Sequence, residues 1–294
     1  MKKFALIGIG EILWDILPSG RQLGGAPANF AYHAHSLGEE GIVVSSVGQD
    51  GLGKEIQNKL KALGLVLDFI TIDKTHPTGI VSVMIDCKGI PDFTIHEDVA
   101  WDYIPETVEL LKLAKRADAV CFGSLAQRSP ISYRTMRNFL HNTSEEALRI
   151  FDINLRQGFY SKVIIEDSLR LASVLKLNEN ELPMVVNILG LEEEENEPLG
   201  VLSELYELKL VALTRGANGS VLYSDGQKSI HDGYSVKVVD TIGAGDAFTA
   251  AMAIGMLKGY KLNHINTIAN RVASYICTQS GATPIIPYEI RGLI

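Results

Sequence analysis

Asp240-Thr241-Ile242-Gly243-Ala244-Gly245-Asp246 leads directly into the small apolar residues Ala247 to Ala253. Residues 243 to 245 carry no bulky side chain, so their backbone N–H groups are unshielded, and the apolar run after them predicts a buried helix. Unpaired N–H groups at a helix start attract anions. A carboxylate beside a bound anion suits a base that takes a proton during phosphoryl transfer, which makes Asp246 the candidate base. The alternative is an Asp that only caps a helix after a glycine turn.

The composition describes a large globular chain with an acidic balance. Its 294 residues are 46% hydrophobic and include 27 glycines, enough for one large α/β domain or two smaller ones. No linker is rich in Pro, Gly or Ser, so we expect a single domain over residues 1–294. A net charge of −8 and a pI near 5.4 argue against nucleic acid as a partner, because binding to phosphate backbones relies on clustered Lys and Arg.

The cysteines and the apolar runs indicate a cytoplasmic protein without a membrane segment. Cys87, Cys121 and Cys277 form no C-x-x-C pair, and we interpret them as reduced thiols. The apolar run that opens the chain ends at Glu11 with no cleavage site after it, so it predicts a buried strand rather than a signal peptide. The longest later run, Ala247 to Leu257, is shorter than the roughly 20 residues that a membrane span needs.

Short apolar runs separated by amphipathic segments predict the α/β fold class, with a mainly parallel sheet that is covered by helices. The expected buried strands include Phe4–Ile9, Ile42–Val47, Ala119–Phe122, Ile150–Ile153 and Leu210–Leu213.

Two segments break this rhythm. Residues 78–100 alternate between apolar and polar side chains, turn at Lys88-Gly89 and return without a helix. Together with residues 11–23 they predict a small β layer over the edge of the sheet. Such a layer suits a flap that closes over a substrate, and an ordinary antiparallel extension explains the same residues.

Two glycine motifs suggest nucleotide sites that their neighbours do not support. Gly8-Ile9-Gly10 begins the dinucleotide fingerprint G-x-G-x-x-G, but Leu13 stands at the position of the third glycine. Residues 48–54 match a P-loop until Glu55, which replaces the Ser or Thr that binds magnesium and would repel phosphate. We interpret this second motif as a loop between a strand and a helix.

Gly24-Gly25-Ala26-Pro27-Ala28-Asn29 is a further glycine-rich segment. Its glycines allow the backbone to approach a ligand closely, and Asn29 offers a donor and an acceptor on the first turn of a helix. These groups suit sugar hydroxyls. A capped helix start without a ligand is the alternative.

The chain carries these two long signatures, Gly24 to Asn29 and Asp240 to Asp246, in the order and at the intervals of a known family. It resembles the ribokinase-like (PfkB) carbohydrate kinases, and the resemblance extends from Gly8 to Gly281. The resemblance implies a three-layer α/β/α ribokinase-like fold with a mainly parallel central sheet and a small β lid from about 11–23 and 78–100. It also implies an enzyme, a carbohydrate kinase that transfers the γ-phosphate of ATP to an alcohol group.

The resemblance assigns the catalytic roles at the second signature. Asp246 corresponds to the base that takes the proton of the sugar hydroxyl, and the backbone of Gly243, Ala244 and Gly245 corresponds to the anion hole. These N–H donors face charge that spreads over the phosphoryl oxygens, so position and electrostatics supply most of the catalysis.

The resemblance also implies nucleotide and metal sites. Asn178-Glu179-Asn180-Glu181 matches N-x-x-E, in which Asn178 and Glu181 position Mg²⁺ and phosphate, partly through water. Without the family, this segment is a polar helix start with a capping pattern. Asp240 and Thr241 correspond to a monovalent-cation site, which implies K⁺. The implied nucleotide-binding residues are Asn178, Thr214, Gly216, Gly219, Asn270 and Gly281.

On the sugar side, Asp15 matches the substrate-binding acid of the family, and Gly24, Gly25 and Asn29 complete that side of the pocket. Residues 152–156 resemble the D-x-N-x-R of fructokinases and of 2-keto-3-deoxygluconate kinases. The guanidinium of Arg156 can bind either a carboxylate or a group of hydroxyls.

We therefore expect a cytoplasmic fructokinase that phosphorylates a primary hydroxyl, with sugar and ATP as partners and a homodimer formed through the β lid. A 2-keto-3-deoxygluconate kinase and a ribokinase or nucleoside kinase are alternatives of the same class. A non-catalytic sugar-binding regulatory homologue is the alternative from a different class, and the intact Asp246 argues against it.

Overall fold

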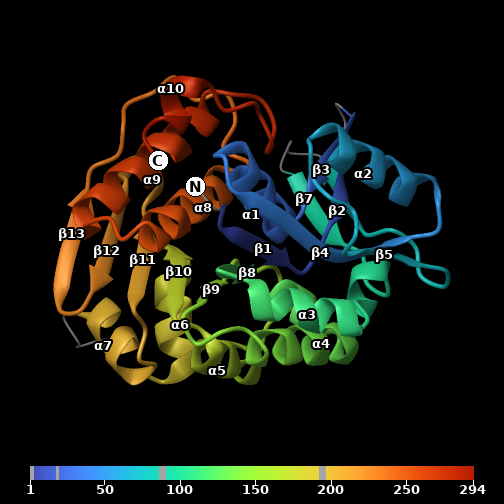
Figure 1. The fold of residues 1–294 in the computed structure, drawn as a ribbon, viewed down its shortest axis with the longest axis horizontal. Helices are drawn as coiled ribbons and strands as arrows, with labels where there is room; N and C mark the ends of the chain where they lie inside the picture. Colours follow the sequence, from blue (N-terminus) through green and yellow to red (C-terminus); the bar gives the residue numbers. More distant parts are fainter. Residues whose placement is uncertain (1–2, 18–19, 86–90, 192–196) are drawn as a thin grey trace.

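The computed structural model describes residues 3–17, 20–85, 91–191 and 197–294. Its main element is a nine-stranded sheet of order β13-β12-β11-β10-β9-β8-β1-β4-β5 (Figure 1). Neighbours from β5 to β11 pair in parallel, and β12 and β13 are antiparallel, so the predicted mainly parallel sheet is confirmed. The strands are β1 (Ala5–Ile9), β4 (Glu40–Gly48), β5 (Ile70–Asp73), β8 (Ala119–Phe122), β9 (Leu148–Asp152), β10 (Val174–Asn178), β11 (Leu210–Thr214), β12 (Ser220–Ser224) and β13 (Gln227–His231).

Helices cover both faces of this sheet and give three layers (Figure 1). The strands in the centre of the sheet are apolar along their whole length, because both faces are buried; every residue of β1 is buried. One face carries α1 (Ala26–Ser36), α2 (Gly51–Ala62), α8 (Ala244–Leu257), α9 (Leu262–Cys277) and the short α10 (Tyr288–Arg291). The other carries α3 (Val108–Arg116), α4 (Pro130–His141), α5 (Lys162–Leu171), α6 (Glu181–Leu189) and α7 (Pro198–Leu205).

Each helical layer has its own apolar core against the sheet. Phe30 of α1 and Phe248 of α8 pack on one face, and Phe139 of α4 packs with Phe122 and Phe151 on the other. Helix α8 is apolar on all sides and fully buried from Ala247 to Gly255, which fits a helix enclosed between the sheet, α1 and α9. The predicted buried helix after Asp246 is confirmed.

A second sheet of four strands lies near strands β4 and β5, at one end of the first sheet (Figure 1). Its order is β3-β2-β6-β7, with β2 and β6 parallel and the outer pairs antiparallel. It consists of β2 (Leu13–Leu17), β3 (Gly20–Gly24), β6 (Ile80–Ile85) and β7 (Pro91–Ile95), which lie in the segments predicted for a small β layer except that β3 extends one residue further, to Gly24. The predicted turn at Lys88-Gly89 lies outside the described residues. Trp14 Nε1 donates to the Leu52 carbonyl (3.1 Å) and ties this sheet to α2.

The parallel strands bring polar residues together at one edge of the main sheet. Asp152, Asn178 and Thr214 are the last residues of β9, β10 and β11, and Glu11 follows β1. Parallel α/β sheets bind ligands at this carboxyl edge. Three 3₁₀ turns complete the chain: Ala100–Tyr103, Leu125–Arg128 and Gly216–Asn218. Within the described ranges, we find no helix with the length and apolarity that crossing a membrane requires.

Candidate active site

Helix α8 begins without a side-chain cap, at the predicted anion hole. Gly243 precedes the helix with a φ of +77°, and a Cβ atom there would lie 2.6 Å from the Ala282 carbonyl oxygen, so the position requires glycine. The Ala244 N–H donates to the Thr241 carbonyl over 3.2 Å. First-turn N–H groups have no partner within their own helix, so this uncapped start can accept an anion.

Asp246 lies in the first turn of α8 and is joined to α1. Asn29 Nδ2 donates to Asp246 Oδ2 over 2.8 Å. Burial, and next the negative charge of Asp152, raise the pKa of Asp246 to about 6, against the opposing Asn29 hydrogen bond and the charges of Lys176 and Arg156. A carboxylate with this pKa is still mostly ionised at neutral pH and is a stronger base than an ordinary Asp.

A buried ion pair lies under the start of α8. Lys176 Nζ of β10 contacts Asp152 Oδ1 over 2.9 Å, and Thr249 Oγ1 donates to Asp152 Oδ2 over 3.0 Å. Both oxygens of Asp152 therefore have protein partners. A Cβ atom at Gly245 would lie 3.2 Å from Lys176 Nζ, which places the ammonium beside the first turn of α8.

Three acids and one guanidinium gather around the predicted sugar-binding residues. Glu11 is 3% exposed; its Oε1 accepts the Ala26 N–H (3.3 Å), and its Oε2 has no partner among the described residues. Burial raises the pKa of Glu11 to about 7, and burial also raises the pKa of Asp15. The positive charge of Arg156 lowers the pKa of Glu11, Asp15 and Asp246, so the guanidinium stands near all three.

The predicted glycines of this side are enclosed by the same acids. A Cβ atom at Gly24 would lie 2.5 Å from Asp15 Oδ2, and one at Gly25 would lie 2.4 Å from the Glu11 carbonyl oxygen. Gly25 also has a φ of +113°. The two glycines thus let β2 and the loop after β1 pack against the start of α1, where Asn29 is carried.

A cavity of about 700 Å³ opens next to Ala244 and Gly245. The ends of β10 and β11, residues 232–238 and α9 form its walls, and its size suits a nucleotide. The predicted nucleotide-binding residues that line it are Asn178, Thr214, Gly216, Gly219 and Asn270. Asn270 Nδ2 donates hydrogen bonds to Ser220 Oγ and Asn266 Oδ1. The first of these bonds also ties α9 to β12.

The N-x-x-E segment forms a reciprocal cap at the start of α6. Asn178 Oδ1 accepts the Glu181 N–H (3.0 Å), and Glu181 Oε2 accepts the Asn178 N–H (2.8 Å). Glu181 Oε1 also accepts the Leu155 N–H (3.0 Å), so both oxygens of this buried carboxylate already have protein partners. Within the described ranges no group of three or more His, Cys, Asp and Glu could hold a metal directly. The donor set fits Mg²⁺ that keeps its water shell, as this ion prefers.

The predicted monovalent-cation residues hold the loop before α8. Asp240 Oδ1 accepts the Ile242 N–H (3.0 Å), and its Oδ2 accepts the Gly281 N–H (3.0 Å). Gly281, predicted to border the nucleotide, is not part of the cavity lining but is tied to this loop. Thr241 does line the cavity.

Sequence reasoning missed the buried charges of the site. Glu11, Asp152 and Lys176 were not predicted as site residues, although each carried a signal. Lys176 interrupts the apolar strand Val174–Leu177, and a charged residue in a strand buried on both faces needs a partner. Glu11 follows directly on an apolar strand at the carboxyl edge of the sheet.

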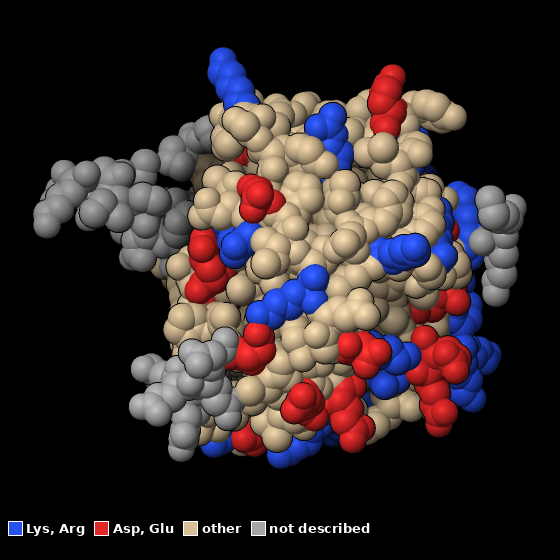
Figure 2. Space-filling model, turned by 90° about the vertical axis from the view of Figure 1, so that its left-hand side faces the viewer, with Lys and Arg blue, Asp and Glu red and all other residues tan. Residues whose placement is uncertain are grey.

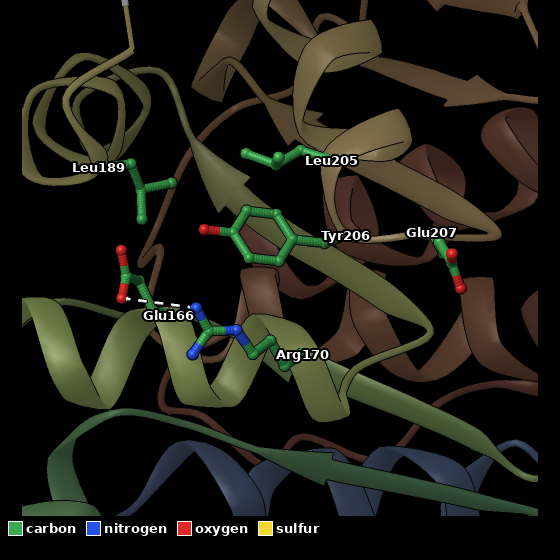
Figure 3. A pocket seen from close by; sticks show the side chains of 6 residues that line it. All are labelled: Glu166, Arg170, Leu189, Leu205, Tyr206 and Glu207. Atoms are coloured by element: carbon green, nitrogen blue, oxygen red, sulfur yellow. Dashed lines mark ion pairs between the residues drawn. The ribbon is translucent and has the colours of Figure 1, made fainter.

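A second cavity, of about 390 Å³, lies between α5, α6 and α7 (Figure 3). Helices α5 and α7 end there, just before β10 and β11 begin, so it sits at the edge of the sheet opposite the site described above. Its charged residues Glu166 and Arg170 pair with each other (3.8 Å). On the face drawn in Figure 2, acidic and basic side chains are interspersed, and no continuous basic stripe appears among its described residues.

Comparison with known proteins gives a consistent result. The model of a family described as pfkB family carbohydrate kinase matches residues 20–288. A sugar kinase of Pyrococcus horikoshii is 30% identical over 297 residues, covering 94% of this chain and 91% of that protein, and its crystal structure superposes with a TM-score of 0.82 over 95% and 93% of the two chains. A fructokinase of Escherichia coli is 27% identical over 297 residues, or 95% of each chain. A fructokinase of Vibrio cholerae with bound fructose, ADP and calcium has a TM-score of 0.82 at 23% identity over 99% and 98% of the chains.

Proposed function

This chain belongs to the pfkB family of carbohydrate kinases, and we propose that it is an ATP-dependent fructokinase with Asp246 as the general base. One observation carries the proposal: a partly buried carboxylate with a pKa of about 6 stands in the first turn of an uncapped helix, next to a cavity of nucleotide size. A regulatory protein that only binds sugar has no use for a strengthened base at that point.

The chemistry is an in-line transfer. Asp246 takes the proton of a sugar primary hydroxyl as that oxygen forms a bond to the γ-phosphorus, the bond to the β-phosphate oxygen breaks, and ADP leaves. The N–H groups of Gly243 and Gly245, with that of Ala244 once it leaves the Thr241 carbonyl, stabilise the negative charge on the phosphoryl oxygens. Asn178 and Glu181 would hold the water shell of Mg²⁺, and the ion would neutralise charge on the phosphates.

Unpartnered polar atoms support a sugar on the Asn29 side of Asp246. Asn29 Oδ1 and Glu11 Oε2 are buried acceptors without a partner among the described residues. Buried polar atoms normally have one, and a hydroxylated ligand would supply the missing donors. Asn29 Nδ2 already bonds Asp246, so the same side chain can align a sugar hydroxyl with the base.

Fructose is the proposed sugar because of Asp15 and Arg156. The pair offers an acceptor for a diol and a planar donor for further hydroxyls. The Escherichia coli relative and the fructose-bound Vibrio cholerae structure support this choice. A guanidinium also suits the carboxylate of 2-keto-3-deoxygluconate, which is therefore the second candidate, before ribose and nucleosides.

A coupled assay of ADP release tests the substrate. The panel is fructose, 2-keto-3-deoxygluconate, ribose, fructose 6-phosphate and nucleosides, each with ATP and Mg²⁺, and the Asp246→Asn variant is the control. We expect fructose to give the highest kcat/KM. Another sugar well above fructose would replace the fructokinase assignment, and sugar binding without ADP from any acceptor would favour the regulatory alternative.

Two further parts of the proposal concern the lid and a cation. The sheet β3-β2-β6-β7 has two edge strands, and such edges can pair with a second copy. We propose that this sheet is a lid and dimerises, which light scattering on the purified protein tests.

The loop held by Asp240 is the proposed K⁺ site, and exchange of K⁺ for choline in the assay of ADP release tests it.

A further inference from the structure

The Asp152–Lys176 pair is the most buried charge pair near the base. Asp152 is 3% exposed and Lys176 7% exposed, and their charged atoms lie 2.9 Å apart. The Thr249 hydroxyl donates a hydrogen bond to the other oxygen of Asp152. Thr249 stands three residues after Asp246, so the two side chains share one face of α8. The pair is thus fixed against the same helix face that carries the base.

The carboxylate of Asp152 has its hydrogen-bond partners within the protein. Asp152 begins the segment that resembles D-x-N-x-R, where an acid would ordinarily be expected to bind hydroxyls. Its two oxygens are instead taken by Lys176 and Thr249. Arg156, four residues later, is exposed and remains available to the substrate. Each oxygen of Asp152 is therefore already paired within the protein.

Both neutral and charged groups from several elements surround Asp246. From α1 come Asn29 as a donor and His33, a histidine whose burial lowers its pKa to about 4 and keeps it neutral. From β8 comes the Cys121 thiol, which burial also keeps neutral by raising its pKa. The groups that bear charge toward Asp246 are Glu11, Asp152, Arg156 and Lys176. Among these, Asp152 makes the largest charge contribution to the pKa of Asp246.

We propose that Asp152 and Lys176 form a positioning pair for Asp246, in which the Asp152 carboxylate strengthens Asp246 as a base and the ammonium and Thr249 hold that carboxylate in place. The inference rests on the proposed role of Asp246 in phosphoryl transfer. It adds a reason for a buried ion pair whose desolvation makes it a poor source of stability. A like charge close by disfavours ionisation, so Asp246 holds a proton more strongly than burial alone would give.

Carbon-13 NMR of protein labelled at the Asp carboxyl groups measures this directly, without sugar or ATP. The Asp246 signal is assigned by its absence in the Asp246→Asn variant. The expected midpoint of its titration is about 6 in the native protein. In Asp152→Asn, where Lys176 then faces Asp246 uncompensated, we expect the midpoint to fall by about one pH unit or more.

Thr249→Val is the matched control, because it removes a hydrogen bond to Asp152 and leaves every charge in place. We expect its midpoint to stay within about 0.3 unit of the native value. Equal shifts in both variants would mean a structural role only and would overturn the proposal, as would an unchanged midpoint in Asp152→Asn.

A double variant covers the case in which Asp152→Asn does not fold. Asp152→Asn combined with Lys176→Met leaves no unpaired charge, and such replacements are often tolerated. Its midpoint should lie below the native one but above that of the single variant, since the Asp152 effect exceeds the Lys176 effect. A midpoint at or above the native value contradicts the proposal.

Kinetics then separate this inference from the kinase assignment. With an accepted sugar, the acidic limb of the kcat/KM–pH profile should move to lower pH in Asp152→Asn and persist in Glu11→Gln. Loss of the limb in Glu11→Gln would assign it to Glu11 and overturn the proposal. If no acceptor is phosphorylated while the NMR midpoint moves as expected, the kinase function fails and the electrostatic pairing stands.

Discussion

Helices α2 and α8 both begin after a glycine-rich loop, and they treat the free N–H groups there in opposite ways. At α2, Asp50 accepts hydrogen bonds from the Gly53 N–H (2.7 Å), the Thr78 N–H (2.8 Å) and the Thr78 hydroxyl (2.7 Å). At α8, Gly243 offers no side chain and the start stays uncapped. The first helix start is capped by the Asp50 carboxylate, and the second, which has no side-chain cap, is the one proposed to bind a ligand.

The two acids show the same contrast in their protonation. Burial alone would raise the pKa of Asp50, but the hydrogen bonds from Thr78 and Gly53 lower it below its usual value. Burial and the Asp152 charge raise the pKa of Asp246 to about 6. Several hydrogen-bond donors around a carboxylate lower its pKa, as at Asp50, whereas the single Asn29 donor at Asp246 does not offset burial and the Asp152 charge. The P-loop-like residues 48–54 thus join a strand to a helix whose start is capped by Asp50.

The largest expected effect is on turnover at the α8 start. Asp246→Asn keeps the size of the side chain and its contact to Asn29 but removes the base, so kcat should fall by about 10² to 10⁴-fold. Binding of ATP and sugar, measured by calorimetry, should stay within a few fold. A variant with near-native kcat would refute Asp246 as the base and remove the distinction between the two helix starts.

A second prediction concerns the stability cost of that base. An Asp whose pKa is about 6 in the fold and 3.8 in the unfolded chain binds more protons when folded between these values, so stability falls as pH rises from about 4 to about 6 and stays low above. Asp246→Asn should therefore be more stable than the native protein by about 2 to 3 kcal/mol at pH 8. The gain should shrink toward pH 4. Urea unfolding at pH 5, 6.5 and 8 measures it, and a gain independent of pH would contradict the raised pKa.

Much of the fold follows from local pattern, as β8 shows. Ala119–Phe122 was predicted with the bounds that the structure gives, because a wholly apolar run between polar residues is a strand buried on both faces. The turn between β12 and β13 has the same local origin: Asp-Gly is a typical two-residue hairpin turn, and both Asp225 and Gly226 have positive φ. These features depend on near neighbours in the chain.

The site was less predictable, because its properties arise from distant parts of the chain. The Asn29–Asp246 bond joins residues 217 positions apart. Family resemblance placed both residues in one site, but not their contact. The raised pKa values of Glu11 and Asp246 come from burial, which exists only after the layers assemble. The role of Asp152 was hidden for the same reason, since the sequence does not show which oxygens Lys176 and Thr249 occupy.

The smallest expected effect is at the α2 start, and its sign with pH should be the reverse of that at α8. Asp50 is ionised in the fold at lower pH than in the unfolded chain, so its stabilising effect is complete above its unfolded pKa of 3.8 and is lost as pH falls through the lower folded value. Asp50→Ala removes the cap and should cost about 1 kcal/mol at pH 7, a typical loss for a helix cap. Asp50→Asn is the matched control, because an amide oxygen still caps a helix and should recover most of that loss. Thermal unfolding of both variants at pH 3 and 7, with kcat measured at pH 7, provides the test, because the loss in Asp50→Ala should be smaller at pH 3. If Asp50→Ala loses turnover as Asp246→Asn does while remaining folded, the α2 start also serves the ligand and the contrast between the two helices does not hold.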